Sequence, residues 1–421
     1  MHPLPNRRHF LKQGSLAGAA LATAPHLFAQ VAGDSPEIKV ALIGCGGRGN
    51  GALNDFLEAC KILKLKPTVV AAADAFPERA KGTADRHGVP AEQTFSGYDA
   101  YHKALKADCN FVILATPPAF RPVHFAAAVE AGKNVFMEKP VAVDAPGCRS
   151  VIETGKLAAG KGLGVVAGTQ RRHQKGYLEN KARLEAGAIG DLRGGIIQWN
   201  GEIPWIADRQ QGWSDTEYLT RNWLNFSEMS GDHIVEQHVH QIDVACWFLG
   251  RMPVSALGFG GRARRRTGNQ FDFFSIDLDF GDDIHINSQC RQVAGCYNRV
   301  GEMFTGTTGS CYGGGKMDGK EVSIPEIKVD TDNSMVQEHV DLLRGVLEEK
   351  PLNDAERIAQ VTAVAIMGRL SAYSGQLVRW VDLMENKKSP FYDLALQPSP
   401  LDFEKGAIQL PAEEPPVPGK A

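Results

Sequence analysis

The sequence predicts an α/β protein in which a parallel sheet is followed by a large, open and mostly antiparallel sheet. From residue 38 to about residue 166, apolar runs of strand length alternate with segments of helical periodicity. This alternation is typical of a parallel sheet that helices cover on both faces. After residue 167, long strand-like runs follow one another without helices between them, as in an antiparallel sheet. The 421 residues are enough for two domains.

The elements of each part follow from these patterns. In the first part we expect strands at 38–43, 69–73, 111–115, 134–137 and 163–166, and helices at 50–62, 124–131 and 148–159. In the second part we expect helices at 177–186, 238–249, 335–348 and 354–374, and strands at 196–199, 256–259, 271–280, 284–289 and 303–307. A doubly wound sheet binds its ligands outside the carboxyl ends of the strands, so the residues that follow the first strands are candidates for a site.

A glycine-rich turn joins the first expected strand to the first expected helix. It reads Gly44-Cys45-Gly46-Gly47-Arg48-Gly49, which is a G-x-G-x-x-G sequence. Gly44 permits the tight turn, Gly46 lets a pyrophosphate approach the backbone, and Gly49 lets the helix pack close to the strand. The helix N-terminus offers free N–H groups to phosphates. The motif in this context predicts a Rossmann domain that binds a dinucleotide through the four glycines and Arg48.

Three further strand ends are expected at the same crevice. The second strand ends at Asp74, where the fingerprint places a carboxylate on the ribose 2′-hydroxyl. This carboxylate favours NAD over NADP, because it would repel a 2′-phosphate. Thr116 and Pro117 follow the next strand, and Glu138 and Lys139 follow the one after it. All of them are expected to contact the cofactor, and the ammonium group of Lys139 can also stabilise charge on the oxygen of a substrate alcohol or ketone.

A cluster of histidines and acids occupies residues 231–243, the second constellation that carries chemistry. His240 is suited to accept a hydroxyl proton while hydride leaves the same carbon, and Glu236 is expected to orient its ring. Two other interpretations stay open. The four side chains of His233, Glu236, His238 and His240 are plausible metal ligands, although their spacing matches no strong zinc motif. In the second alternative, the histidines are hydrogen-bonded polar groups at a domain interface and have no catalytic role.

At these residues the chain resembles the glucose–fructose oxidoreductase, inositol dehydrogenase and rhizopine catabolism family, Gfo/Idh/MocA. The matching pieces are the glycine-rich turn, Ala115-Thr116-Pro117, Glu138-Lys139-Pro140 and His240-Gln241-Ile242-Asp243. The resemblance implies a Rossmann domain, a second domain whose open sheet often serves oligomer contacts, and NAD(P)-dependent chemistry at a sugar or polyol hydroxyl. The family's lysine corresponds to Lys139 and its catalytic histidine to His240. Glu236 stands where the family usually has aspartate, and His238 where it usually has glycine.

Four side chains are expected to contact the substrate. Arg171 lies in Gln170-Arg171-Arg172-His173, which resembles the family's site-lining segment and is otherwise a surface turn. Trp199, Trp205 and Trp223 offer apolar rings on which a sugar can stack, or else belong to the core; of the three we expect Trp205 and Trp223 to contact the substrate. His238, next to the candidate base, adds bulk and polarity.

The N-terminus is expected to be an export signal. Asn6-Arg7-Arg8-His9-Phe10-Leu11-Lys12 resembles a twin-arginine signal, which is an address that a translocase reads and not a membrane anchor. The apolar stretch 16–28 that follows is too short to span a bilayer. We therefore expect the domains to be a signal peptide (1–33), a Rossmann domain (34–166), a substrate and oligomerisation domain (167–395) and an extended tail (396–421), in a periplasmic protein.

These observations favour an NAD(P)-dependent oxidoreductase that moves hydride between a sugar, polyol or glycoside hydroxyl carbon and a tightly held nicotinamide. The net charge of −3 argues against a nucleic-acid partner. The open sheet suggests a homodimer or homotetramer. Two alternatives are an NAD-dependent glycoside hydrolase, acting by transient oxidation and elimination with His238 as an added acid or base, and a non-catalytic sugar-binding protein.

Overall fold

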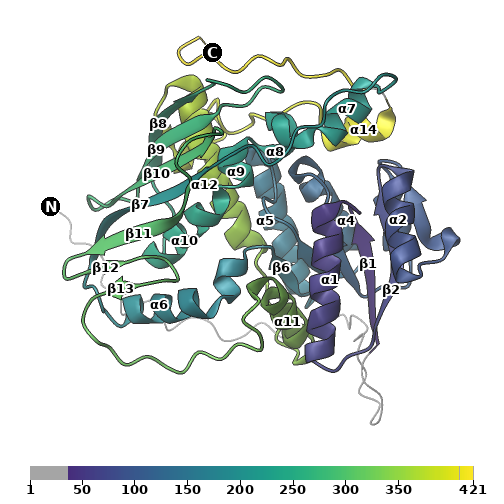
Figure 1. The fold of residues 1–421 in the computed structure, drawn as a ribbon, viewed down its shortest axis with the longest axis horizontal. Helices are drawn as coiled ribbons and strands as arrows, with labels where there is room; N and C mark the ends of the chain where they lie inside the picture. Colours follow the sequence, from purple (N-terminus) through teal and green to yellow (C-terminus); the bar gives the residue numbers. More distant parts are fainter. Residues whose placement is uncertain (1–36, 407, 421) are drawn as a thin grey trace, which may run out of the picture. The chain divides into compact units, whose positions relative to one another are not determined.

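Six parallel strands form the first sheet of the computed structural model, which describes residues 37–406 and 408–420 (Figure 1). Their order is β3-β2-β1-β4-β5-β6. They are β1 (Ile38–Ile43), β2 (Pro67–Asp74), β3 (Thr94–Ser96), β4 (Phe111–Leu114), β5 (Asn134–Met137) and β6 (Val165–Ala167). The order reverses between β1 and β4, and doubly wound folds bind their ligands outside the carboxyl ends of strands at such a point. The expected signal peptide, 1–33, lies outside the described residues.

Helices cover both faces of this sheet, and the side chains of β1 alternate between the faces. Val40 and Leu42 belong to a core cluster with residues of α1 (Gly47–Ile62). Ala41 and Ile43 belong to another cluster, with residues of α4 (Arg121–Glu130) and α5 (Ala145–Gly160). Burial on both faces explains the continuous apolar runs that predict these strands. Two helices that the sequence patterns above do not include, α2 (Pro77–His87) and α3 (Ala100–Leu105), follow β2 and β3.

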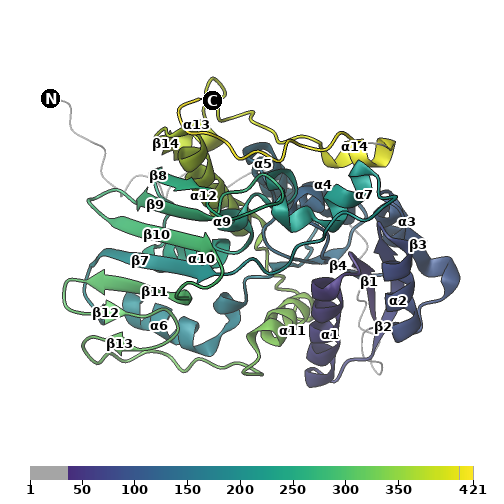
Figure 2. The same ribbon diagram turned by 45° about the horizontal axis from the view of Figure 1, so that its top comes forward.

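The second sheet has eight strands in the order β13-β12-β11-β7-β10-β9-β8-β14 (Figure 2). They are β7 (Leu192–Gly201), β8 (Ser255–Gly261), β9 (Phe273–Asp279), β10 (His285–Gln292), β11 (Arg299–Gly306), β12 (Ser310–Cys311), β13 (Met317–Asp318) and β14 (Val378–Arg379). β7 and β10 are parallel, and the other neighbouring strands are antiparallel, which confirms the predicted architecture. One face packs on α10 (Val239–Leu249) and α12 (Ala355–Ser374). Alternate residues of β10 are exposed on the other face.

Short helices connect the two sheets and carry several candidate residues. η3 (Gln170–His173) and α6 (Lys175–Glu185) precede β7. Between β7 and α10 the chain forms α7 (Asp215–Arg221), η4 (Trp223–Asn225), α8 (Ser227–Ser230) and α9 (His233–Glu236). Helices of three to seven residues are too short for a clear apolar periodicity, so the sequence does not predict those between β7 and α10. Within the described part of the chain, no helix has both the length and the apolar character that crossing a membrane requires.

Two later segments of the chain pack against the first sheet and its helices. α11 (Ser334–Leu347) contributes Val336 and Val340 to the cluster that contains α1. α14 (Pro400–Lys405) begins with a capping box at Ser399 and buries Phe403 against Tyr98. The prediction of an extended tail over 396–421 is therefore wrong at α14, because a capped helical turn with a buried aromatic side chain forms there.

Candidate active site

A cavity of about 900 Å³ lies outside the carboxyl ends of β1, β2 and β4. Its wall includes the whole turn 44–49, Asp74, Thr116 and Pro117. These are all of the predicted cofactor residues except Glu138 and Lys139. Residues of α2, of the segment 205–223 and of the segments 97–101 and 120–124 also contribute to the wall. The structure thus brings the ends of three strands, far apart in the sequence, to one concave surface of the size that a small-molecule site requires.

The glycines of the turn have the geometry that the motif predicts. Gly44 has φ +98°, and a Cβ there would lie 2.5 Å from the carbonyl carbon of Ala115. A Cβ on Gly49 would lie 1.8 Å from the oxygen of Gly44, so the helix can approach the strand only without one. Above Gly46 there is open space, since the nearest atom to a Cβ there is Arg79 Nη1 at 4.0 Å. The backbone at Gly46 is therefore open to a phosphate group at the N-terminus of α1, which fits a dinucleotide.

Asp74 is held at the cavity by the backbone of two turns. One carboxylate oxygen accepts the N–H of Cys45 at 2.7 Å, and the other accepts the N–H of Phe76 at 3.0 Å. Burial raises the pKa of Asp74, although these hydrogen bonds oppose the shift. The carboxylate joins the glycine-rich turn to the start of α2. Its predicted contact with a ribose hydroxyl stays a prediction that its position allows.

Arg48 and Glu138 form an ion pair beside the cavity. Arg48 Nε lies 2.7 Å from Glu138 Oε1, and its Nη2 lies 2.9 Å from Asp55. Arg48 lines the cavity, whereas Glu138 does not. The structure therefore places Glu138 behind Arg48, so the carboxylate positions the guanidinium and does not itself face the cavity that would hold the cofactor.

Lys139 and Glu236 meet where β5 ends and α9 ends. The ammonium group of Lys139 lies 2.9 Å from Glu236 Oε1 and also donates to the main-chain carbonyl of Glu236. The peptide bond between Lys139 and Pro140 is cis. Glu236 is predicted above to orient His240, but within residues 37–406 and 408–420 no hydrogen bond joins the two side chains. That prediction is corrected: the partner of the Glu236 carboxylate is Lys139.

His240 lies near the start of α10 with its ring stacked on Trp199 of β7. The ring centroids are 5.6 Å apart and the planes are inclined by 20°. Burial, and then the charges of Lys139 and Arg171, hold the pKa of His240 well below its usual value. The imidazole is therefore neutral at pH 7, the form that can accept a proton. Trp199 is absent from the predicted site residues; an aromatic residue on an expected strand is the one signal that the sequence offers for it.

Arg171 lies in η3 on the same side of the molecule as His240 and Trp199. Its guanidinium carbon is 5.8 Å from the centroid of Trp199, and its Nε donates to Tyr177 Oη at 3.1 Å. The carboxylate of Glu302 lies 3.6 Å from the same Nε. Arg171 is thus a fixed cation near His240, which is compatible with its predicted role as a substrate contact.

His238 occupies the core and not a substrate-facing surface. The side chain is fully buried, and its Nε2 is 2.8 Å from Ser288 Oγ of β10. Burial lowers the pKa of His238 to about 3, so the ring is neutral. Its predicted contact with substrate does not fit this position.

The alternative of a metal site is not supported either, because the four suggested ligands have separate surroundings. His233 pairs with Asp232, and no group of three or more His, Cys, Asp or Glu that could hold a metal occurs in the described residues.

Trp205 and Trp223 line the cavity that contains the glycine-rich turn. Their rings form an edge-to-face pair with centroids 5.9 Å apart, and Trp213 lies in the same wall. Lys139 and His240 do not line this cavity. The two tryptophans, predicted as a platform for sugar, thus lie on the cofactor side of the site. The chain brings them there through the irregular segment before α7, whose path no sequence pattern indicates.

Asp243, the acid of the His-x-x-Asp sequence, is part of a buried ion cluster. Its carboxylate lies 2.8 Å from Arg172 Nε and 3.0 Å from Arg357 Nη1. Arg172 belongs to η3 and Arg357 to α12, so the cluster ties α10 to two other elements. Asp243 therefore fixes the helix that presents His240 and has its charge already paired.

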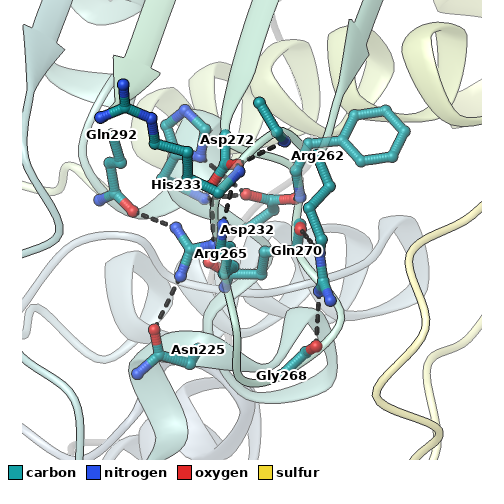
Figure 3. A network of polar contacts seen from close by, with 12 residues as sticks. Asn225, Asp232, His233, Arg262, Arg265, Gly268, Gln270, Asp272 and Gln292 are labelled. Carbon is teal, nitrogen blue, oxygen red and sulfur yellow. Dashed lines mark hydrogen bonds and ion pairs between the residues drawn. The ribbon is translucent and has the colours of Figure 1, made fainter. Parts of the chain in front are cut away.

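A buried polar network that includes Asp232, Arg265 and Gln292 lies next to α9 (Figure 3). Asp232 has φ +72°, and its carboxylate accepts the N–H of His233, which stabilises this uncommon backbone conformation. On the other side, Gln292 Nε2 donates a hydrogen bond to Gln237 Oε1 at 2.8 Å, and Gln292 Oε1 accepts a hydrogen bond from the buried Arg265. The position of the Glu236 carboxylate beside Lys139 is thus determined by contacts with β10 and with the loop before β9.

Two family models match the chain. Residues 38–165 match a model described as an oxidoreductase family with an NAD-binding Rossmann fold. Residues 177–312 match a model described as a GFO/IDH/MocA C-terminal domain. The two matches together cover more than half of the chain and include most strands of both sheets.

Individual relatives and solved structures are similar to parts of the chain. Inositol 2-dehydrogenase of Klebsiella pneumoniae (strain 342) is 31% identical over 154 residues, 37% of this chain and 43% of the relative. Inositol 2-dehydrogenase 3 of Saccharopolyspora erythraea is 30% identical over 236 residues, 56% of this chain and 60% of the relative. The chain spans about half the length of the curated relatives it matches.

Two solved structures illustrate the shared fold. Levoglucosan dehydrogenase in complex with NADH and levoglucosan has a TM-score of 0.63 at 17% identity, over 82% of this chain and 99% of that chain. Aldose–aldose oxidoreductase from Caulobacter crescentus, complexed with glycerol, has a TM-score of 0.62 at 18% identity, over 82% of this chain and 99% of that chain.

Proposed function

The chain belongs to the Gfo/Idh/MocA oxidoreductase family, and from this premise we propose that it moves hydride between a hydroxyl-bearing carbon of a sugar, polyol or glycoside and NAD. The observation that carries the proposal is the contact between Lys139, which follows β5, and Glu236, together with a neutral His240 whose pKa the charge of Lys139 lowers. Lys139 directly follows Glu138, which is paired with Arg48 of the cavity wall. The substrate class is the one named for similar proteins, inositol and levoglucosan dehydrogenases.

The cavity fits the cofactor that the family model assigns. The open backbone at Gly46 and the N-terminus of α1 would hold the pyrophosphate, and Asp74 would meet the adenosine ribose. When bound, NAD accepts a hydride from a carbinol carbon or, in its reduced form, returns one to a carbonyl carbon. Trp205 and Trp223 form part of the wall of this cavity.

Lys139 is the residue that we assign to the substrate oxygen. An ammonium group there stabilises negative charge as the hydroxyl loses its proton. The hydrogen bonds from Lys139 to the Glu236 carboxylate and carbonyl fix its position and leave one of its three donors free. Glu236 is therefore a positioning residue in this proposal, acting through Lys139.

His240 is the residue that we assign to the proton. Its neutral imidazole can accept the hydroxyl proton during oxidation and, once protonated, can donate it back during reduction. Two cations, Lys139 and Arg171, oppose its protonation in the absence of substrate. The stack on Trp199 restricts the orientation of the ring.

The test is a spectral assay with variants. Purified protein would be mixed with NAD and with an inositol, levoglucosan or an aldose, and absorbance would be followed in the reduced-nicotinamide band. We expect turnover with at least one substrate, and losses of about 10²–10³-fold for Lys139→Met and about 10²–10⁴-fold for His240→Asn. Dinucleotide binding without any spectral response in the presence of these polyols and sugars would contradict the proposal.

The two alternative functions lack support. The hydrolase hypothesis uses His238 as an added acid or base, but this residue is fully buried and paired with Ser288. A non-catalytic sugar-binding protein gives no reason for a buried Lys139–Glu236 pair whose cation lowers the pKa of a neutral imidazole. Free sugar released without a net change in cofactor would revive the first alternative.

We further propose that the protein is exported by the twin-arginine translocase and works in the periplasm with its dinucleotide retained between turnovers. Residues 6–12 of the sequence support export. Replacing Arg7 and Arg8 together by lysine should leave the protein in the cytoplasm, measured by cell fractionation.

We also propose a dimer or tetramer through the exposed face of the second sheet, where Leu257 and Phe259 are 50% and 67% exposed. Light scattering of the purified protein tests the assembly, and a monomer would contradict it.

A further inference from the structure

One arginine of a basic run lies in the interior of the protein. The run Arg262-Ala263-Arg264-Arg265-Arg266 belongs to the connection between β8 and β9. The residues on either side of Arg265 are exposed, but its own side chain is completely buried. Asp272 faces it, with 3.6 Å between Arg265 Nε and Asp272 Oδ1. Arginine is rarely buried in full unless its charge and its donors are paired, so the other partners of this guanidinium are informative.

One terminal nitrogen of Arg265 leads to the wall of the cofactor cavity. Its Nη1 donates to Asn225 Oδ1 at 2.7 Å (Figure 3). Asn225 Nδ2 donates in turn to the main-chain carbonyl of Trp205 at 3.3 Å and to Asn222 Oδ1 at 2.7 Å. Asn222 Oδ1 also accepts the N–H of Ala207 at 3.0 Å. Trp205 and Ala207 line the cavity, so these hydrogen bonds fix the backbone of two residues of its wall.

The other terminal nitrogen leads to the candidate catalytic residues. Nη2 of Arg265 donates to Gln292 Oε1, and Gln292 Nε2 donates to Gln237 Oε1 at 2.8 Å. Gln237 directly follows Glu236, the residue that holds Lys139. The main-chain carbonyl of Gln237 accepts the N–H of His240 at 3.4 Å. Gln237 therefore lies between Glu236 and His240, and its side chain is held through Gln292 by Arg265.

A guanidinium is suited to hold two such partners at once. Its planar group fixes the directions of its N–H donors, so two acceptors on different elements are held in a set geometry. Asn225 and Gln292 are both buried, and without Arg265 each would leave an acceptor unpartnered in the interior. Small displacements matter at the reacting groups, because a shift of about 1 Å caused from a distance can lower a rate by about 10²-fold.

We propose that Arg265 is a positioning residue that holds the segment 236–240 and the Trp205 part of the cavity wall in one arrangement. It acts through Gln292 and Asn225, and it is not itself part of the cavity wall. The inference rests on the proposed function, because it assumes that a dinucleotide binds in the cavity and that Lys139 and His240 act on a substrate. It implies that one buried side chain supports both the rate of hydride transfer and the affinity for the cofactor.

The test uses three variants of the full-length protein and two measurements. The Kd of NADH is obtained from energy transfer between the cavity tryptophans and the reduced nicotinamide. The rate is the single-turnover formation of NADH at saturating NAD, with the inositol, levoglucosan or aldose that the spectral assay identifies as substrate. Urea unfolding of each variant sets the conditions under which all of them are folded.

The variants cut the two routes separately and together. Gln237→Met removes the end of one route and should lower the rate by about 10-fold, with the Kd of NADH within about twofold of wild type. Asn225→Asp keeps an acceptor for Arg265 but cannot donate to Trp205, so it should raise the Kd by about 10-fold and leave the rate within about twofold. Arg265→Met should do both, with a loss of about 10–100-fold in rate.

Two further variants separate geometry from charge. Arg266→Ala removes the next arginine of the same run, which is exposed, and should change neither the rate nor the Kd. Arg265→Lys keeps a positive charge near Asp272 but lacks the planar fork. It should therefore restore the midpoint of urea unfolding more fully than it restores the rate and the Kd.

Two results would overturn the inference while the proposed function stands. If folded Arg265→Met keeps the wild-type rate and Kd and loses only stability, Arg265 supports the fold alone. If Gln237→Met and Asn225→Asp each lower the rate and the affinity to the same extent, the two routes are not separate. These two variants retain Arg265, so they decide the question even if Arg265→Met does not fold. Wild-type protein that binds no NADH or turns over no sugar or polyol would overturn the proposed function first, and the inference with it, so the failures are distinguishable.

Discussion

The ammonium group of Lys139 lies 2.9 Å from the carboxylate of Glu236, and both side chains are only 13% exposed. Lys139 follows β5 of the parallel sheet, and Glu236 ends α9 in the second half of the chain. The contact therefore joins the two halves of the molecule at the candidate site. We therefore expect Glu236 to influence His240 through Lys139, whose charge lowers the pKa of the imidazole.

The first prediction concerns this chain of influence. Glu236→Gln should lower kcat/KM by about tenfold, because Lys139 loses its charged partner but keeps the main-chain carbonyl. Lys139→Met should lower it by about 10²–10³-fold. The double variant should be no worse than Lys139→Met alone, because the carboxylate has no other way to act. A double-mutant cycle of kcat/KM measures this coupling, and fully additive losses would contradict it.

The second prediction concerns pH. Burial, Lys139 and Arg171 hold the pKa of His240 well below its usual value of about 6.5, so His240 stays neutral until the pH falls well below that value. The wild-type kcat/KM should therefore be independent of pH on the acid side down to below pH 6.5. In Lys139→Met one of the two cations is gone, so the pKa of His240 rises. The decrease of kcat/KM on the acid side of the pH profile, its acid limb, should therefore begin at a higher pH. A pH–rate profile of both proteins measures the limb, and an unchanged limb in the variant would contradict the assigned proximity.

The third prediction concerns stability and His238. Burial lowers the pKa of His238 to about 3 in the folded protein, whereas an unfolded histidine has a pKa of about 6.5. Below pH 6.5 the unfolded state therefore binds the extra proton, and the free energy of unfolding decreases as the pH falls. The contribution reaches about 1.4 kcal/mol per pH unit well between the two values. Urea unfolding from pH 7 to pH 5 should show a smaller decrease for His238→Asn than for the wild type, and equal slopes would contradict a neutral buried His238.

Local patterns predict the part of the site that local structure builds. The turn 44–49 and Asp74 follow single strands, so a motif with its flanking periodicity is enough to place them in one cavity. The meeting of Lys139 with residues of the 231–243 cluster depends on how two sheets pack, and the sequence indicates it only through the family resemblance. The partner of Glu236 is not predictable from spacing: His240 is four positions away, but the Glu236 carboxylate pairs with a residue 97 positions away.

Burial is the second quantity that the sequence does not provide. His238 and His240 are two residues apart in the same polar cluster, but the ring of His238 is paired with β10, and that of His240 is stacked on β7. Trp205 lies on an irregular segment whose path is set by tertiary contacts. No sequence periodicity therefore predicts on which side of the site Trp205 lies. These differences arise from packing between distant elements, which overrides local propensity.

The last prediction separates a structural acid from a catalytic one. Asp243 is 1% exposed and pairs with Arg172 and Arg357. Asp243→Asn removes the buried charge that faces Arg172 and Arg357, although Arg357 keeps its ion pair with Asp354 at 2.9 Å. Breaking a buried pair in this way typically costs about 3–5 kcal/mol, so the free energy of unfolding in urea should fall by about that amount. Asp85→Asn, which removes an exposed partner of Lys81, should change it by less than about 1 kcal/mol.

The pH dependence of the same variant has a definite sign. Burial would raise the pKa of Asp243, but Arg172 and Arg357 outweigh it and hold the pKa below its usual value. The stabilisation from the cluster is therefore present above about pH 4 and is lost as the pH falls through the folded pKa, and Asp243→Asn should be less sensitive to pH over that range. At a temperature where both proteins are folded, kcat/KM should change by no more than about tenfold, because the carboxylate acts on the position of α10 and not on the substrate. A loss of a thousandfold in kcat/KM with the stability unchanged would mean that Asp243 takes part in the proton transfer, and the assignment of that step to His240 alone would then be wrong.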